Sequence, residues 1–205
     1  MRVLDLFSGC GGFRLGFQQA GYEIVAFVEH WEPAIQTFII NHPNAHLLGR
    51  DITKIDDDTI LNYRKQVDII IGGPPCQGFS QCGKRDPNDK RNKLYKEFLR
   101  FVRLIEPKMV VMENVPGLIS MKDEEGNKVI YKIIEDLNKF NYSVSYKVLT
   151  ASEYGVAQKR KRLFIIGKKL NLFPTSLNHT KIVMQAIGNL PNHVIILNGH
   201  RFLQP

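Results

Sequence analysis

Long apolar runs, cysteine pairs and an export signal are all missing from this sequence of 205 residues. No run approaches the roughly 18 apolar residues of a membrane-spanning helix. Asp5 interrupts the opening stretch, where a signal peptide needs an apolar core. Three cysteines, an odd number, disfavour a disulfide framework. These absences predict a soluble, cytoplasmic protein that does not associate with membranes, and the 43% hydrophobic and 23% charged composition excludes collagen, coiled coil and disorder.

Metal-ligand spacing is also missing. Cys76 and Cys82 have five residues between them but lack the second pair that a structural zinc site needs. The six histidines form no ligand cluster. We therefore expect no metal site. Cys10 and Cys82 are interpreted as a small side chain in a turn and a loop residue.

Basic residues, by contrast, are concentrated in two segments of a chain whose formal net charge is +8. Residues 81–93 hold five basic and two acidic side chains, and residues 158–169 hold six basic side chains and no acid. Charge gathered in this way is typical of a surface that binds a polyanion. The alternative is a pair of solvated faces that keep the protein soluble.

Short apolar runs alternate with segments of helical spacing along most of the chain. The expected strands are residues 2–7, 24–29, 67–71, 109–112, 143–149 and 163–166. The expected helices are residues 13–20, 33–41, 93–105 and 128–140. Strand and helix in alternation predict an α/β fold with a mostly parallel sheet, helices on both faces and ligands at the carboxyl ends of the strands.

A glycine-rich turn, DLFSGCGGF, follows the first expected strand. Glycines at such a position let the backbone approach a ligand and place N–H groups at a helix N-terminus, although a tight turn alone would also explain them. Arg14 stands where a dinucleotide fingerprint requires its last glycine, so NAD is disfavoured. Glu29 ends the next strand, where an acid commonly binds ribose hydroxyls. Asp51 is a further candidate contact or an ordinary cap.

Two later strands run into GGPPCQGFS and ENVPG. Cys76 follows two prolines that stiffen its loop, which suits a nucleophile, although a buried cysteine is the common alternative. If these strands are neighbours, Cys76 and Glu113 face one pocket. Partial burial would raise the pKa of Glu113 enough for it to donate a proton. Its alternative is a strand-end acid bonded to backbone N–H groups.

The segment QKRKRLFII precedes the last clear strand. In an extended chain Arg160 and Arg162 point one way, and Lys159 and Lys161 point the other. One face would then meet a buried ligand and the other a phosphate backbone. A basic edge strand that resists aggregation is the alternative. Residues 81–91 are either a lid or plain surface.

Together DLFSGCGG, GGPPCQGFS, ENVPG and QKRKR, in this order, resemble the cytosine-5 DNA methyltransferases, and AIGNLP at residues 186–191 extends the likeness. The resemblance implies a Rossmann-like fold that binds S-adenosylmethionine (SAM) and flips a cytosine out of double-stranded DNA. It implies a nucleophilic role for Cys76, base contacts for Glu113 and Arg162, and a catalytic position close by for Arg160. The implied SAM-binding residues are Phe7, Gly9, Gly11, Gly12, Glu29, Asp51, Ile52 and Pro74. The implied DNA-binding residues are Gln77, Ser80, Lys84, Arg85 and Arg91, in a loop over residues 77–93.

The sequence departs from the family pattern in two places. His30 stands directly after Glu29, where members often carry an aromatic residue, and Trp31 comes next. No target-recognition domain or Gly-Asn-Ser motif follows residue 191. We therefore expect a SAM-binding catalytic domain at residues 1–170 and, at residues 171–205, a segment leading to a missing or separately encoded recognition domain.

The resemblance predicts a nucleoid-associated enzyme of a restriction–modification system, with a second subunit as a candidate partner. Two alternatives stay open. The first is a transfer-RNA cytosine-5 methyltransferase with a similar site. The second is a catalytically silent fragment that binds nucleic acid or SAM.

Overall fold

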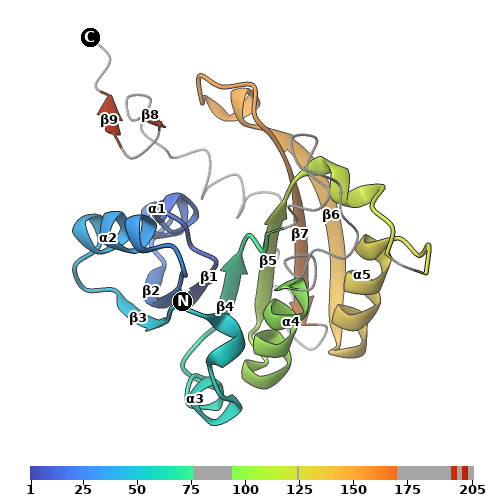
Figure 1. Ribbon diagram of the computed structural model, residues 1–205. Coiled ribbons are helices and arrows are strands. Elements are labelled where there is room, and N and C mark those ends of the chain that lie inside the picture. Colours follow the sequence, from blue (N-terminus) through green and yellow to red (C-terminus); the bar gives the residue numbers. More distant parts are fainter. Residues whose placement is uncertain (76–93, 124, 170–194, 198–199, 203–205) are drawn as a thin grey trace.

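The computed structural model describes residues 1–75, 94–123 and 125–169, together with the backbone of residues 195–197 and 200–202. Within them, seven strands form one sheet in the order β3-β2-β1-β4-β5-β7-β6 (Figure 1). The strands are β1 Arg2–Leu6, β2 Glu23–Val28, β3 His46–Gly49, β4 Ile69–Gly72, β5 Met109–Asn114, β6 Tyr142–Thr150 and β7 Lys161–Lys169. The helices are α1 Gly12–Gln19, α2 Glu32–Asn41, α3 Asp57–Leu61, α4 Leu94–Ile105 and α5 Val129–Lys139. A separate pair joins β8 Ile195–Leu197 to β9 His200–Phe202.

The sheet is mostly parallel, as the alternation of strands and helices predicts. β1 pairs in parallel with β2 and β4, and these pair in parallel with β3 and β5. β7 is the exception, because it runs antiparallel to both β5 and β6. The connection from Thr150 to Lys161 holds only a short 3-10 turn at Ala151–Tyr154. A parallel return would need a longer crossover, usually with a helix, so β7 turns back along β6.

Besides β8 and β9, the elements β3 and α3 have no counterpart in the sequence-based expectation. β3 has four partly exposed residues at the sheet edge, which is too short for an alternating pattern. α3 has five residues, and its N-terminus is capped by Asp56, whose side chain accepts from the backbone N–H of Thr59. Short 3-10 turns at Ile52–Lys54 and Pro116–Ile119 also escape periodicity.

Helices cover both faces of the sheet, and the core lies between the layers. Leu4 and Leu6 of β1 belong to the larger cluster, which includes Phe98 of α4 and Ile130 of α5. Val3 belongs to the cluster on the other face, together with residues of α1. Successive side chains of a strand point to opposite faces, so both layers are held by the same strands. In the described part of the chain, every helix is too short or too polar to span a bilayer.

Candidate active site

Two pockets adjoin at the carboxyl edge of the central strands. Their volumes are about 530 Å³ and about 540 Å³, and both are lined by Phe7 and Gly73. Phe7 directly follows β1 and Gly73 directly follows β4, and the last pair in the register of these strands is Leu6 with Gly72. The first pocket lies toward β2 and β3, and the second lies toward β5 and β7. Two ligands, one bound in each pocket, would therefore meet at Phe7 and Gly73.

The glycine turn is fastened to Glu29 at the end of β2. Gly9 donates its backbone N–H to Oε2 of Glu29 at 2.8 Å, and His30 and Trp31 donate theirs to Oε1 at 2.9 Å. Glu29 is only 8% exposed, yet its carboxylate can accept further hydrogen bonds. The turn itself requires unusual backbone, since Phe7 has φ 57° in the left-handed region. This edge of the first pocket therefore offers an acceptor for hydroxyl donors.

The rest of the first pocket combines apolar and charged side chains. Val28 and Ile52 supply apolar surface, and Arg50 and Asp51 lie beside them. Asp51 accepts from both the backbone N–H and the hydroxyl of Thr53. These hydrogen bonds lower the pKa of Asp51, so it is ionised at neutral pH. Such a pocket suits a ligand with both a flat apolar part and hydroxyl or amine groups.

Glu113 and two arginines gather in the second pocket. Arg162 lies with its Nε 2.7 Å from Oε1 of Glu113, and Arg160 lines the same pocket. Burial raises the pKa of Glu113, while the nearby charges of Arg162 and Arg160 act in the opposite direction. Burial and the charge of Arg162 lower the pKa of Arg160. The pocket therefore presents a carboxyl, with its pKa raised by burial, beside guanidinium donors.

Two residues that sequence reasoning missed, Gly73 and Asn114, contact the residues around the two pockets. An ideal Cβ on Gly73 would lie 3.1 Å from Oε2 of Glu113, so a glycine leaves room for that carboxyl. Asn114, which is 5% exposed, donates its Nδ2 to the carbonyl oxygen of Pro74 at 3.0 Å. Its Oδ1 accepts from the backbone N–H of Val115. Periodicity gives no signal for such contacts. Their one sequence signal is position: Asn114 directly follows Glu113, and Gly73 lies in the Gly-Gly-Pro-Pro stretch.

The structure brings most of the described candidates to the two pockets, but Gly9, Gly11 and Pro74 line neither of them. Gly9 and Gly11 build the turn, and Gly11 precedes α1 with φ 88°. Pro74 is buried and binds Asn114, whereas its neighbour Pro75 lines the first pocket. The candidates that line the first pocket are Phe7, Glu29, Asp51 and Ile52, and those that line the second are Phe7, Gly12, Glu113, Arg160 and Arg162.

The remaining candidates lie outside the described residues. They are Cys76, Gln77, Ser80, Lys84, Arg85 and Arg91. The strand arrangement on which the convergence of Cys76 and Glu113 depends is confirmed, because β4 and β5 are parallel neighbours with Gly72 opposite Met112. Within the part of the chain that the structure describes, no group of three or more His, Cys, Asp or Glu side chains could hold a metal ion.

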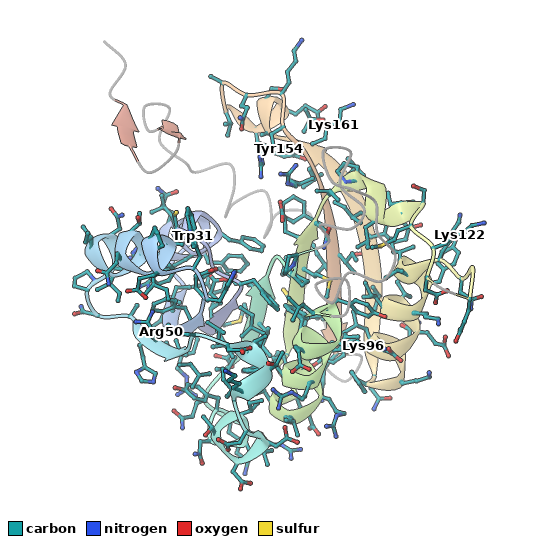
Figure 2. The ribbon with its side chains drawn as sticks, viewed as in Figure 1. Trp31, Arg50, Lys96, Lys122, Tyr154 and Lys161 are labelled. Atoms are coloured by element: carbon teal, nitrogen blue, oxygen red, sulfur yellow. The ribbon has the colours of Figure 1, made fainter. Side chains whose placement is uncertain are left out.

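The walls of the two pockets come from opposite arms of the sheet. Figure 2 shows Trp31 and Arg50 beside α2 and β3, and Tyr154 and Lys161 near the meeting ends of β6 and β7. Arg50 lines the first pocket and Tyr154 the second. Lys161 is exposed, whereas Arg162 is partly buried. The alternation predicted for the basic segment is seen in the exposure of Lys161 and Arg162, whereas Lys159 and Arg160, which precede β7, are both exposed.

Comparisons with known proteins point to one family. The sequence model of the C-5 cytosine-specific DNA methylase family matches residues 1–194. The type II methyltransferase M.DdeI of Desulfomicrobium norvegicum is 46% identical over a match covering 82% of this chain and 41% of that protein. M.AquIA of Picosynechococcus is 36% identical, with 93% of this chain and 89% of that protein covered.

A solved structure has the same fold. It is a DNA modification methyltransferase encoded within an E. coli prophage, with a TM-score of 0.70 and 36% identity over 82% of this chain and 47% of that one. This chain spans about half the length of the first curated relatives it matches, 41% of one and 53% of another. The family match over residues 1–194 nonetheless covers all residues that line the two pockets and the strands that carry them. The chain belongs to the C-5 cytosine-specific DNA methylase family.

Proposed function

We propose that this chain is the catalytic part of an enzyme that methylates C5 of cytosine in double-stranded DNA. The observation that carries the proposal is the junction of the two pockets at Phe7 and Gly73. Group transfer requires that donor and acceptor be held together in a defined orientation. A pocket lined by a ribose-type acid, Glu29, which binds the glycine turn through Gly9, adjoins a pocket with a carboxyl and two guanidinium groups. This arrangement suits a nucleoside cofactor beside a nucleobase.

The first pocket fits SAM. Its volume of about 530 Å³ lies within the usual range for cofactor sites, about 300–1,000 Å³. Glu29 would hold the ribose hydroxyls, because its carboxylate has acceptor capacity beyond its three backbone partners. Asp51 and Ile52 would contact the adenine. When bound, SAM supplies an electrophilic methyl group.

The second pocket suits a cytosine turned out of the duplex. Glu113 would bind N3 and the exocyclic amine, and the burial that raises the pKa of its carboxyl favours a role in proton transfer at N3. Arg162 would donate to O2 of the base, because a guanidinium is a donor without acceptors. Arg160, on the same wall, would add a second positive charge. An enzyme that acts on a ring carbon must take the base out of the stack.

We further propose Cys76 as the nucleophile. Its thiolate would add to C6 of the base, and the electron pair displaced from the C5–C6 double bond makes C5 nucleophilic. After C5 has gained the methyl group, loss of the C5 proton restores the double bond and expels the thiolate. Pro75, the residue before this cysteine, lines the first pocket, and Gly73 lines both, which supports the placement.

The remaining parts of the enzyme are proposed from the comparison with M.AquIA. Residues 1–170 would form the SAM-binding domain, and residues 171–205 would lead to a target-recognition domain on a second subunit. The match to 89% of M.AquIA supports this arrangement, because that type II methyltransferase is itself little longer than the aligned region. A restriction–modification system would be the setting, as the type II names of the relatives suggest.

Covalent trapping tests the proposal. Duplex DNA containing 5-fluorocytosine is incubated with SAM, the chain and the product of any neighbouring gene that encodes a recognition domain. Fluorine at C5 cannot leave as a proton, so the S–C6 adduct persists. We expect an adduct with the unmutated chain and none with Cys76→Ala. Equal signals from the two would refute the covalent step.

The same assay separates the two alternatives. Transfer RNA is compared with duplex DNA at one salt concentration, because phosphate contacts make affinity fall steeply with salt. Methylation of transfer RNA in preference to DNA would move the activity to RNA. DNA binding without an adduct or methyl transfer would identify a silent fragment.

A further inference from the structure

Arg100 of α4, which the function proposed above does not use, joins this helix to the segment after β3. Its Nη2 donates to the carbonyl oxygens of Ile52 and Ile55, each at 2.9 Å. Its Nη1 lies 2.6 Å from Oδ1 of Asp57, and its Nε lies 2.8 Å from Oε2 of Glu97. The side chain is 21% exposed. One guanidinium therefore makes four contacts, three of them to a different part of the chain.

The segment that Arg100 holds has little regular structure of its own. It contains a 3-10 turn of three residues, Ile52–Lys54, capped by Asp51. A turn of this length has no repeating hydrogen-bond ladder, so its position depends on tertiary contacts. The side chains of Ile52 and Ile55 are buried, and Gly49 leaves space for Ile55, because an ideal Cβ there would lie 2.8 Å from its Cδ1.

Both sides joined by Arg100 reach the first pocket. Asp51 and Ile52 line it from the segment, and Leu94, the first residue of α4, lines it from the helix. α4 is a continuous helix of 12 residues packed in the core through Phe98 and Phe101. It is therefore a rigid support, and the guanidinium ties the less regular wall of the pocket to it.

We infer that Arg100 is a positioning residue for the adenine end of the cofactor pocket, an inference that rests on the function proposed above. Its fork holds the backbone of Ile52 at a fixed distance from α4 and so sets the spacing between two walls. The planar guanidinium suits this task, since it satisfies two carbonyls and a carboxylate at once. A lysine ammonium keeps the charge but cannot reproduce that geometry.

Arg100→Lys is the test, with Arg103→Lys as its control on the exposed face of the same helix. The dissociation constants for S-adenosylhomocysteine and for duplex DNA are measured by calorimetry and by anisotropy. Amide hydrogen exchange is followed at Thr53 and Lys54 without ligand. We expect Arg100→Lys to bind S-adenosylhomocysteine about tenfold more weakly, the ratio that corresponds to about 1.4 kcal/mol. Its DNA affinity stays unchanged, and Thr53 and Lys54 exchange faster.

A second variant guards against a general loss of folding. Asp57→Asn removes one anchor of the guanidinium at a side chain that is 52% exposed and outside the pocket lining. We expect a weaker effect in the same direction, about twofold in S-adenosylhomocysteine affinity, with an unchanged thermal midpoint. A fold-change near tenfold in Arg100→Lys and near twofold in Asp57→Asn, with the control unaffected, supports the inference.

Two results would overturn it. One is unchanged S-adenosylhomocysteine affinity and unchanged exchange at Thr53 and Lys54 in Arg100→Lys. The other is an equal loss of S-adenosylhomocysteine and DNA affinity, which would indicate general loosening. If the unmutated chain binds no S-adenosylhomocysteine, the proposed function fails and this inference falls with it, an outcome distinct from either result in the variant alone.

Discussion

Arg162 of β7 and Glu113 of β5 meet diagonally across an antiparallel pair, with Nε 2.7 Å from Oε1. Glu113 is directly opposite Phe164, so Arg162 is two residues away on the same face of the sheet. Long side chains reach such diagonal neighbours. The contact exists because β7 lies beside β5 and is antiparallel to it. This arrangement brings the basic segment to the pocket that holds the Glu113 carboxyl.

Glu113→Gln should slow methyl transfer by a factor of roughly 100 or more, the usual range for a positioned acid. Glutamine has a similar shape but cannot hold a proton for N3 of the base. Single-turnover methylation of duplex DNA measures the effect. Affinity for S-adenosylhomocysteine should stay unchanged, because Glu113 lines only the second pocket. Near-normal turnover would remove this residue from the chemistry.

Asn114→Ala should lower the free energy of unfolding by about 1–3 kcal/mol, the cost of leaving a buried polar partner unpaired. The carbonyl oxygen of Pro74 would lose the amide that it accepts from at 3.0 Å. Methyl transfer should slow as well, since Pro75 lines the first pocket. Urea denaturation measures the change. Asn127→Ala, at an exposed asparagine, is the control and should change stability by no more than about 0.5 kcal/mol.

Glu29→Gln should weaken binding of S-adenosylhomocysteine by about tenfold or more, about 1.4 kcal/mol. The carboxylate accepts three backbone N–H groups with its two oxygens, and an amide offers only one acceptor oxygen. The backbone N–H groups and the ribose hydroxyls would therefore compete for that single oxygen. Calorimetry measures the affinity, and Glu23→Gln, exposed at the start of β2, is the matched control. Equal affinities in the two variants would contradict the assignment.

His42 should make the protein less stable in mild acid. Burial, aided by the charge of Arg14, lowers the pKa of His42 from 6.5 to about 4. The unfolded chain then binds more protons than the folded protein between these values, so stability falls as the pH drops through this window. The free energy of unfolding should fall by about 2 kcal/mol from pH 7 to pH 5 through this group.

Urea denaturation at several pH values checks the role of His42. The His42→Gln variant has no titrating ring and should lose most of this pH dependence. A variant whose stability changes with pH as steeply as that of the unmutated protein would assign the effect to another group.

Regular elements could be predicted because their signals are local. Apolar spacing placed α4 within one residue of its observed start and placed α5 within one residue at each end. β5 is longer than expected, since it runs through Glu113 and Asn114, polar residues that apolar periodicity leaves out. β3 was missed because its four residues are partly exposed, whereas the four residues of β4 are buried and apolar enough to be recognised. α3 was missed because five residues make little more than one helical turn.

The sequence alone determined the order of strands and helices, the glycine turn and the motifs that resemble a methyltransferase, because side-chain alternation and turn chemistry act over a few residues. Tertiary structure decided which motifs touch. Asn114 reaches Pro74 across 40 positions, and Arg100 reaches Ile52 across 48. Strand order and the antiparallel course of β7 bring such distant groups together. They follow from how the whole core packs, a property that no short stretch of chain contains.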